Sequence, residues 1–148
     1  MNKKKSFRST VLCAAFCGSG KTFICNSSEY SAVEVEFWEY KNKNLEKKYV
    51  KDVKKQLGKV DYVFLATDPD GLDLLNKEGL DIVLVYPQKE LRNEYLDRYI
   101  ERDNPYDFIG TMMLRWNKII DELDELSYCK KIILKEGEYL SDVISLIK

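Results

Sequence analysis

One apolar run passes directly into a turn with two glycines, and this junction restricts the fold more than any other part of the sequence. Residues 10–16 are almost continuously apolar, and Gly18 and Gly20 follow them. Continuous rather than alternating apolarity is typical of a strand that is buried on both faces of a parallel sheet. A helix is expected to begin near Lys21. The junction therefore predicts a strand–turn–helix unit around a central parallel strand.

The rest of the sequence alternates between strand and helix signals. Further strands are predicted at residues 33–40, 61–67, 81–86 and 132–135. Helices are predicted at residues 44–59, 72–77, 89–102, 106–126 and 141–148. This alternation indicates an α/β fold whose parallel sheet is covered by helices on both faces. With 148 residues, of which 45% are hydrophobic, the chain suits one domain over residues 1–148.

Residues 15–22 match the phosphate-binding pattern G-x-x-x-x-G-K-[ST], except that Ala15 stands at the first glycine position. The two glycines allow the backbone to turn its N–H groups inward, toward an anion. Lys21 can bridge the β- and γ-phosphates, and the Thr22 hydroxyl can hold Mg²⁺. We expect the polyphosphate of a nucleoside triphosphate such as ATP to be bound by Cys17, Gly18, Ser19, Gly20, Lys21 and Thr22.

Two residue types limit the remaining chemistry. The chain has no histidine, which excludes Ser-His-Asp triads and histidine-containing zinc sites. None of the four cysteines forms a C-x-x-C pair, so a zinc ribbon is not expected. We interpret the cysteines as reduced, small hydrophobic residues. Cys17 has the alternative interpretation of a reactive thiol, because inward N–H groups would stabilise a thiolate.

Acidic residues near predicted strand ends are candidates for the metal site. Asp68 follows the third strand and is the first candidate for a Mg²⁺-water ligand, although residues 68–71 also read as a simple turn. Glu34 and Glu36 lie on the same side of the second strand and could face a nucleoside or a metal, or could lie on a solvent-facing edge. Trp38 and Tyr40 are the aromatic candidates to face a base or acceptor.

Four arginines could surround the phosphoryl group in transfer. Arg98 and Arg102 are four residues apart and share a helix face, Arg92 lies on the same helix, and Arg115 on the next one. Cations around the transferred group offset the charge that develops on it, and a helix next to a proline break could close as a lid. The alternative is pairing with nearby surface acids.

The phosphate loop, Tyr86-Pro87 after the fourth strand and the Arg98-Tyr99-x-x-Arg102 segment together resemble the P-loop nucleoside monophosphate kinase group. The likeness is greatest to small P-loop kinase-like proteins of bacteriophages. The resemblance implies a three-layer P-loop NTPase fold with a five-stranded parallel sheet in the order 2-3-1-4-5. It also implies Mg²⁺-dependent transfer from ATP to a (deoxy)nucleoside monophosphate. Arg98, Arg102 and Arg115 would be lid arginines, and Glu36 would contact the acceptor or the metal. Arg92, on the same predicted helix as Arg98, is a further candidate for binding the acceptor.

The expected partners are therefore a nucleoside triphosphate and a nucleoside monophosphate. A net charge of −1 argues against nucleic acid, and no apolar run approaches the ~20 residues of a membrane span. The apolar run after Lys3, Lys4, Lys5 and Arg8 lacks a cleavage site, so we expect a cytoplasmic protein. Two alternatives stay open: a nucleotide-binding regulatory protein without turnover, and a kinase of a modified base or nucleic-acid end. A homodimer also stays open.

Overall fold

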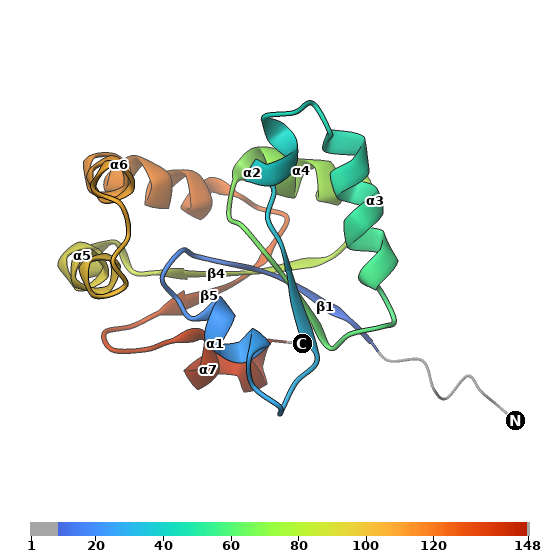
Figure 1. Ribbon diagram of the computed structural model, residues 1–148, viewed down its shortest axis with the longest axis horizontal. Coiled ribbons are helices and arrows are strands. Elements are labelled where there is room, and N and C mark those ends of the chain that lie inside the picture. The colour runs from blue at the N-terminus through green and yellow to red at the C-terminus, as the bar shows by residue number, and fades with distance from the viewer. Residues whose placement is uncertain (1–8, 148) are drawn as a thin grey trace, which may run out of the picture.

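Five parallel strands form one sheet in the order β2-β3-β1-β4-β5 (Figure 1). The computed structural model describes residues 9–147; the N-terminal cations considered above and Lys148 lie outside this range. The strands are β1 (Val11–Ala15), β2 (Ala32–Val35), β3 (Tyr62–Leu65), β4 (Ile82–Pro87) and β5 (Lys130–Leu134). The helices are α1 (Lys21–Cys25), α2 (Trp38–Lys41), α3 (Glu46–Gln56), α4 (Pro69–Lys77), α5 (Arg92–Glu101), α6 (Tyr106–Glu125) and α7 (Leu140–Val143), with 3-10 turns η2 (Lys89–Leu91) and η3 (Ile144–Leu146). The predicted α/β class, parallel sheet and strand order are confirmed.

The central strand β1 determines where a ligand can bind. Cys13 pairs in register with Phe64 of β3 on one side and with Val83 of β4 on the other. The chain therefore crosses to one side of β1 after α3 and to the other side after α4. Where strand order reverses in this way, the loops beyond the carboxyl ends of the strands leave a crevice. The glycine turn after β1 lies at this point.

Two apolar clusters sandwich the sheet, because successive strand residues point to opposite faces. Leu12, Ala14 and Phe16 join the larger cluster under α3 to α6. Cys13 and Ala15 join the smaller cluster under α1 and α7. Figure 1 shows α1 and α7 on one side of the sheet and α3 and α4 on the other.

The second strand is shorter than predicted. Residues 33–40 read as one strand because aromatic and β-branched residues favour strands. The strand instead ends at Val35, and α2 begins at Trp38. The buried Phe37 ring packs in a T-shaped contact with Tyr49, and the N–H groups of Tyr40 and Lys41 bond to its carbonyl. Packing against α3 thus overrides the local propensity.

Other element boundaries differ by smaller amounts. Residues 68–71 are neither a free turn nor a strand end, since Asp68 caps α4 by accepting from the Asp70 N–H at 2.9 Å and Pro69 occupies its first turn. The fifth strand begins at Lys130, two residues earlier than predicted. The last predicted helix is split into α7 and η3, and the first turn of the predicted helix at 89–102 is the 3-10 turn η2.

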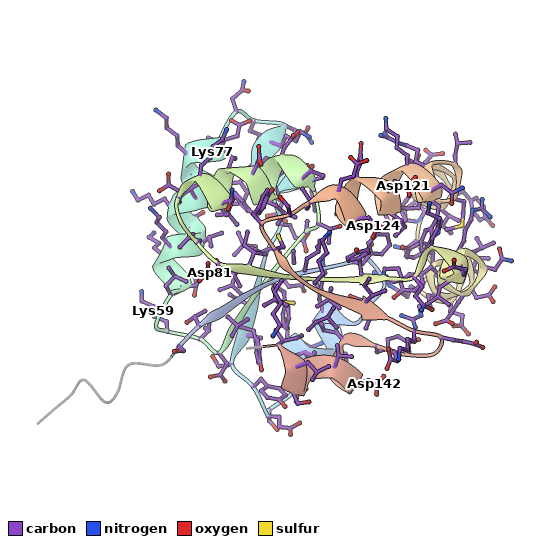
Figure 2. All side chains as sticks on the ribbon, turned by 180° about the vertical axis from the view of Figure 1, so that it is seen from behind. Lys59, Lys77, Asp81, Asp121, Asp124 and Asp142 are labelled. Carbon is purple, nitrogen blue, oxygen red and sulfur yellow. The ribbon has the colours of Figure 1, made fainter. Side chains whose placement is uncertain are left out.

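Strand β4 and helix α6 are joined by a polar contact as well as by apolar packing. The Tyr86 hydroxyl donates to the Asp124 carboxylate, which ties β4 to α6, and Figure 2 shows Asp124 and Asp121 on that helix. Burial, followed by the Asp124 contact, raises the pKa of Tyr86. Within residues 9–147, no helix is long and apolar enough to cross a membrane.

Candidate functional site

The loop between β1 and α1 is folded as a tight turn. The Ser19 backbone N–H and hydroxyl both donate to the Phe16 carbonyl, at 3.0 and 2.6 Å. Gly18 and Gly20 have φ angles of 88° and 107°. Residues with a side chain rarely adopt such angles, so both positions need glycine. The turn at this junction is the one that the sequence predicts.

The carbonyl groups of this loop are held by the surrounding protein. The Tyr99 hydroxyl donates to the Cys17 carbonyl at 2.9 Å. Arg98 Nη1 donates to the Gly18 carbonyl at 3.0 Å, and the Leu140 N–H donates to the Ser19 carbonyl at 2.8 Å. In a trans peptide the C=O and the next N–H point in opposite directions. Anchoring these carbonyls therefore turns the neighbouring N–H groups the other way.

The N–H groups of the loop point away from its anchored carbonyl groups. In the part of the chain that the structure describes, the N–H groups of Gly18, Gly20, Lys21 and Thr22 donate to no protein acceptor. All four residues line a cavity of about 650 Å³. Converging, unpaired N–H groups form an anion-binding concavity. Because α1 has only five residues, these N–H groups, rather than a long helix dipole, supply the positive potential.

Lys21 lies in the cavity wall and not in the core. Its ammonium group pairs with Glu36 Oε1 at 3.3 Å, and the two side chains are 13% and 23% exposed. Both residues line the cavity. A polyphosphate in the cavity could take the place of Glu36 as the partner of Lys21, since both offer anionic oxygens.

Thr22 and two glutamates offer oxygen ligands next to Lys21. The Thr22 hydroxyl donates to Glu34 Oε2 at 3.4 Å, and Glu36 lies beside it on the same cavity wall. Burial raises the pKa of Glu34, Lys21 opposes the rise, and Glu36 adds to it. Hydroxyl and carboxylate oxygens suit Mg²⁺, which commonly binds one or two carboxylates together with substrate phosphates. The donor set at Thr22, Glu34 and Glu36 therefore fits Mg²⁺.

Asp68, the first sequence candidate for the metal site, lies elsewhere. It caps α4 and pairs with Lys41 at 3.3 Å, and Lys41 also pairs with Asp70 at 2.9 Å. Asp68 does not line the cavity around Lys21. Among residues 9–147 no group of three or more His, Cys, Asp or Glu side chains could hold a metal ion. A metal at Thr22 would thus depend on ligand oxygens from the phosphates.

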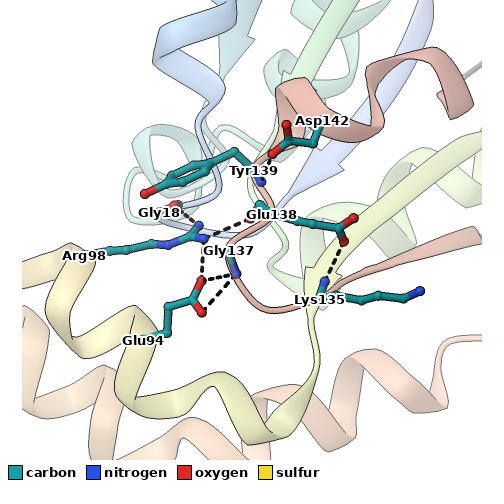
Figure 3. Close-up of polar contacts among 8 residues, drawn as sticks. All are labelled: Gly18, Glu94, Arg98, Lys135, Gly137, Glu138, Tyr139 and Asp142. Atoms are coloured by element: carbon teal, nitrogen blue, oxygen red, sulfur yellow. Dashed lines mark hydrogen bonds and ion pairs between the residues drawn. The ribbon is translucent and has the colours of Figure 1, made fainter.

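Arg98 is a buried connection between three segments (Figure 3). Besides its bond to the Gly18 carbonyl, the Arg98 guanidinium donates to the Glu138 carbonyl at 2.9 Å and to the Glu94 carboxylate at 2.7 Å. The Tyr139 ring lies 3.7 Å from its guanidinium carbon. Arg98 is 5% exposed. These contacts make Arg98 a positioning residue for the phosphate loop, in contrast to the free lid cation that the resemblance implies.

Arg102 is the cation that stays open to the cavity. It lines the same cavity, and a Cβ built on Gly18 would stand 3.3 Å from its Nη1 atom. Its guanidinium has no ion pair or hydrogen bond to residues 9–147. Arg102 can therefore contact an anion at the phosphate loop without first breaking a bond.

The remaining predicted residues divide between two places. Trp38 is 60% exposed and lies on the cavity rim. Tyr40 does not line the cavity; its hydroxyl donates to Asp52 at 2.7 Å. Arg92 bonds the Met113 carbonyl at 2.9 Å, and Arg115 lines a separate cavity with acidic residues. The structure does not bring Tyr40, Arg92 or Arg115 to the phosphate loop.

A second cavity, of about 340 Å³, adjoins the first. Cys17, Lys21, Glu36 and Trp38 line both cavities. Its other walls come from the segment after β3 and from one face of α6. A group bound there would lie next to a phosphate held by the loop.

Sequence reasoning missed the residues that hold the loop carbonyls. Glu94 is one of the nearby acids that the sequence offers as an alternative partner of the arginines, but no pattern gives a role to Tyr99, Leu140 or Tyr139. Their contacts join positions 40 to more than 80 residues apart in sequence, so no local pattern signals them. The spacing of Tyr95, Arg98 and Tyr99 on one helix face was the only available hint.

Comparison with known proteins adds no family to this geometry. A scan against protein-family models finds no match for the chain, and a search of curated proteins finds no match either. The site is thus defined by the loop itself, its unpaired N–H groups and the charged residues around it.

Proposed function

We propose that this protein is a phosphotransferase of the P-loop NTPase fold, which binds a nucleoside triphosphate at residues 17–22 and transfers its γ-phosphoryl group. The observation that carries the proposal is the set of unpaired N–H groups around Lys21, at the crevice beyond β1. A triphosphate supplies the anionic oxygens that such a concavity binds. The adjoining cavity provides a place for the acceptor. The (deoxy)nucleoside monophosphate that the resemblance implies is the first acceptor to test.

The roles follow from the contacts. The N–H groups of Gly18 and Gly20 would hold the β-phosphate, while Lys21 would leave Glu36 to bind the β- and γ-oxygens. Arg102 would neutralise charge that builds up on the transferred group. Thr22 and Glu34 would hold Mg²⁺, which supplies charge neutralisation when bound. Arg98 would keep the Gly18 carbonyl turned away from the phosphates.

A nucleotide-binding protein without turnover is the second candidate. One observation favours it: of the three expected lid arginines, Arg98 is committed to structural bonds and Arg115 lies in a separate cavity. Arg102 alone stays available among these three. A site with few cations around the transferred group would bind a nucleotide but stabilise the transition state weakly.

Nucleotide binding is tested by fluorescence titration with a labelled ATP analogue and Mg²⁺. Lys21→Ala should weaken binding by about 10- to 100-fold, since a hydrogen bond to a charged group contributes about 1.5–3 kcal/mol. Lys77→Ala is the matched control, because it removes one positive charge from an exposed position on α4, outside both cavities (Figure 2). Equal affinities of the two variants, or no binding by the unaltered protein, would refute the proposal.

Transfer is tested separately by incubating the protein with ATP, Mg²⁺ and each nucleoside monophosphate. Formation of nucleoside diphosphate supports the kinase. Nucleotide binding without formation of ADP on any acceptor, nucleosides included, favours the regulatory candidate. Labelled phosphate that appears in a polynucleotide indicates a kinase of a modified base or nucleic-acid end instead.

A further inference from the structure

The second cavity has walls of two different kinds. The side formed by α6 contributes the apolar residues Phe108, Met112 and Ile119, and Trp38 is a further aromatic residue of the cavity wall. Flat apolar groups of the acceptor would pack against this side, where aromatic and aliphatic side chains can bury them. Lys21 and Glu36 of its wall also line the cavity at the phosphate loop, and Glu122 lies on α6.

The polar groups of this cavity are mainly acidic. Glu36, Asp68 and Glu122 line it, and Lys21 is the one cation among the described residues of its wall. Lys21 is already paired with Glu36, and Asp68 with Lys41. Glu122 has no ion pair or hydrogen bond to residues 9–147. No lining cation is thus free to receive a phosphate group from the acceptor.

Arg115 adds no cation to the wall of this cavity. It lines the neighbouring cavity, together with Asp68, Asp70, Glu122 and Glu125. When Lys21 turns to the phosphates of the donor nucleotide, Glu36 is left without its partner. A second phosphate in the acceptor cavity would then face the carboxylates of Glu36 and Glu122, and like charges repel at close range.

Taking the proposed phosphotransferase as its basis, we propose that the acceptor is an uncharged, hydroxyl-bearing compound of nucleoside size, and not a nucleoside monophosphate. Its flat part would lie between Trp38 and α6, and its hydroxyl would point toward Glu36 and Lys21. The hydroxyl oxygen forms a bond to the γ-phosphorus while the bond from that phosphorus to the β,γ-bridging oxygen breaks. The hydroxyl proton passes to the Glu36 carboxylate, and the nucleoside diphosphate leaves.

The test compares nucleosides with their own monophosphates. Equilibrium dialysis measures binding of adenosine, guanosine, cytidine and thymidine, and of their 5′-monophosphates, to the protein with Mg²⁺ and a non-hydrolysable ATP analogue. At least one nucleoside should bind about tenfold or more tightly than its monophosphate, since the added charges meet unpaired carboxylates. The same nucleoside should support formation of ADP from ATP. Tighter binding of every monophosphate, or no binding of any nucleoside, would overturn the inference.

A pair of variants on α6 tests the charge argument itself. Glu122→Lys places a cation in the cavity wall and should improve monophosphate binding by about tenfold relative to the unaltered protein. Glu125→Lys makes the same charge change on the same helix outside this cavity and should alter it much less. An equal response of both variants would contradict the argument. Binding of the ATP analogue alone separates the proposals: if it persists while monophosphates are preferred, only this inference fails.

Discussion

At the scale of single residues, two separate constraints require glycine at position 18. Its φ of 88° is unfavourable for other residues, and a Cβ at this position would lie 2.9 Å from Tyr99 Cε1. Gly58 has a similar φ of 82° but has nothing within 4 Å of the corresponding Cβ position. A comparison of substitutions at Gly18 and Gly58 therefore separates the effect of backbone strain from the effect of close packing.

We expect Gly18→Ala to lower the free energy of unfolding by about 3 kcal/mol, through strain and overpacking together, and to abolish nucleotide binding. Gly58→Ala should cost about 1 kcal/mol, from strain alone, and leave binding unchanged. Urea unfolding and nucleotide titration measure the two effects. Similar losses in both variants would mean that the Tyr99 contact adds nothing.

Ionisation of Glu34 is expected to lower the free energy of unfolding as the pH rises. Burial raises its pKa, so the folded protein retains the Glu34 proton at a pH where the unfolded chain has released it. Stability contributed through this group is therefore highest at low pH and is lost as the pH rises through the raised pKa. We expect Glu34→Gln to increase the free energy of unfolding at pH 7, with a gain that disappears below about pH 4, near the pKa of unfolded Glu.

Urea unfolding of the Glu34→Gln variant between pH 3.5 and 8, without Mg²⁺, checks this expectation. Glu39→Gln is the control, since Glu39 is an acid that follows the same strand but lines neither cavity. A gain that is independent of pH, or equal in both variants, would show that burial of the Glu34 charge is not its cause.

At the scale of elements, Arg98 joins α5 to the phosphate loop and to the segment between β5 and α7. Its three hydrogen-bond partners require a planar, branched donor, which a lysine ammonium cannot reproduce. We expect Arg98→Lys to cost about 3 kcal/mol, as for a disrupted buried pair. It should also speed hydrogen exchange at Gly137 to Leu140 and weaken nucleotide binding.

Arg92→Lys is the matched control for Arg98→Lys. Arg92 precedes Arg98 on the same helix and is exposed, and its guanidinium donates to the carbonyl of Met113 alone. Its replacement should cost about 1 kcal/mol or less and leave exchange at Gly137 unchanged. If exchange at Gly137 to Leu140 is equally slow in both variants, Arg98 does not hold this segment.

The elements also show where sequence patterns are sufficient. A strand that is buried on both faces of a sheet needs a continuous run of apolar residues, so β1, β3 and β4 were predictable from their apolar runs. Residues 36–40 were not, because Phe37 and Tyr40 have strand propensity and yet pack on α3 as part of a turn and a helix. The glycine turn after β1 was predictable because Gly18, Gly20 and Lys21 lie within four consecutive residues. Its supports, Arg98, Tyr99 and Leu140, come from distant segments, and only the fold brings them together.

At the scale of the whole molecule, both apolar clusters contribute a residue that holds the phosphate loop, Tyr99 in the larger cluster and Leu140 in the smaller one. Leu140 is fully buried in the smaller cluster, and its N–H holds the Ser19 carbonyl. Leu75 is equally buried, but in the larger cluster and outside both cavities. Because both clusters share one sheet, the loss of either leucine weakens the same fold.

We expect Leu140→Ala and Leu75→Ala each to lower the free energy of unfolding by about 2–5 kcal/mol, since both leave a cavity in the core. The two variants should differ in nucleotide affinity. A cavity beneath α7 loosens the contact between Leu140 and Ser19, which frees the Ser19 carbonyl to turn toward the phosphates and weakens binding. A cavity beneath α4 leaves that contact intact, so Leu75→Ala should bind as the unaltered protein does. Urea unfolding together with titration of the ATP analogue, at a temperature where both variants are folded, decides this. Equal affinities would show that the smaller cluster stabilises the fold without shaping the phosphate loop.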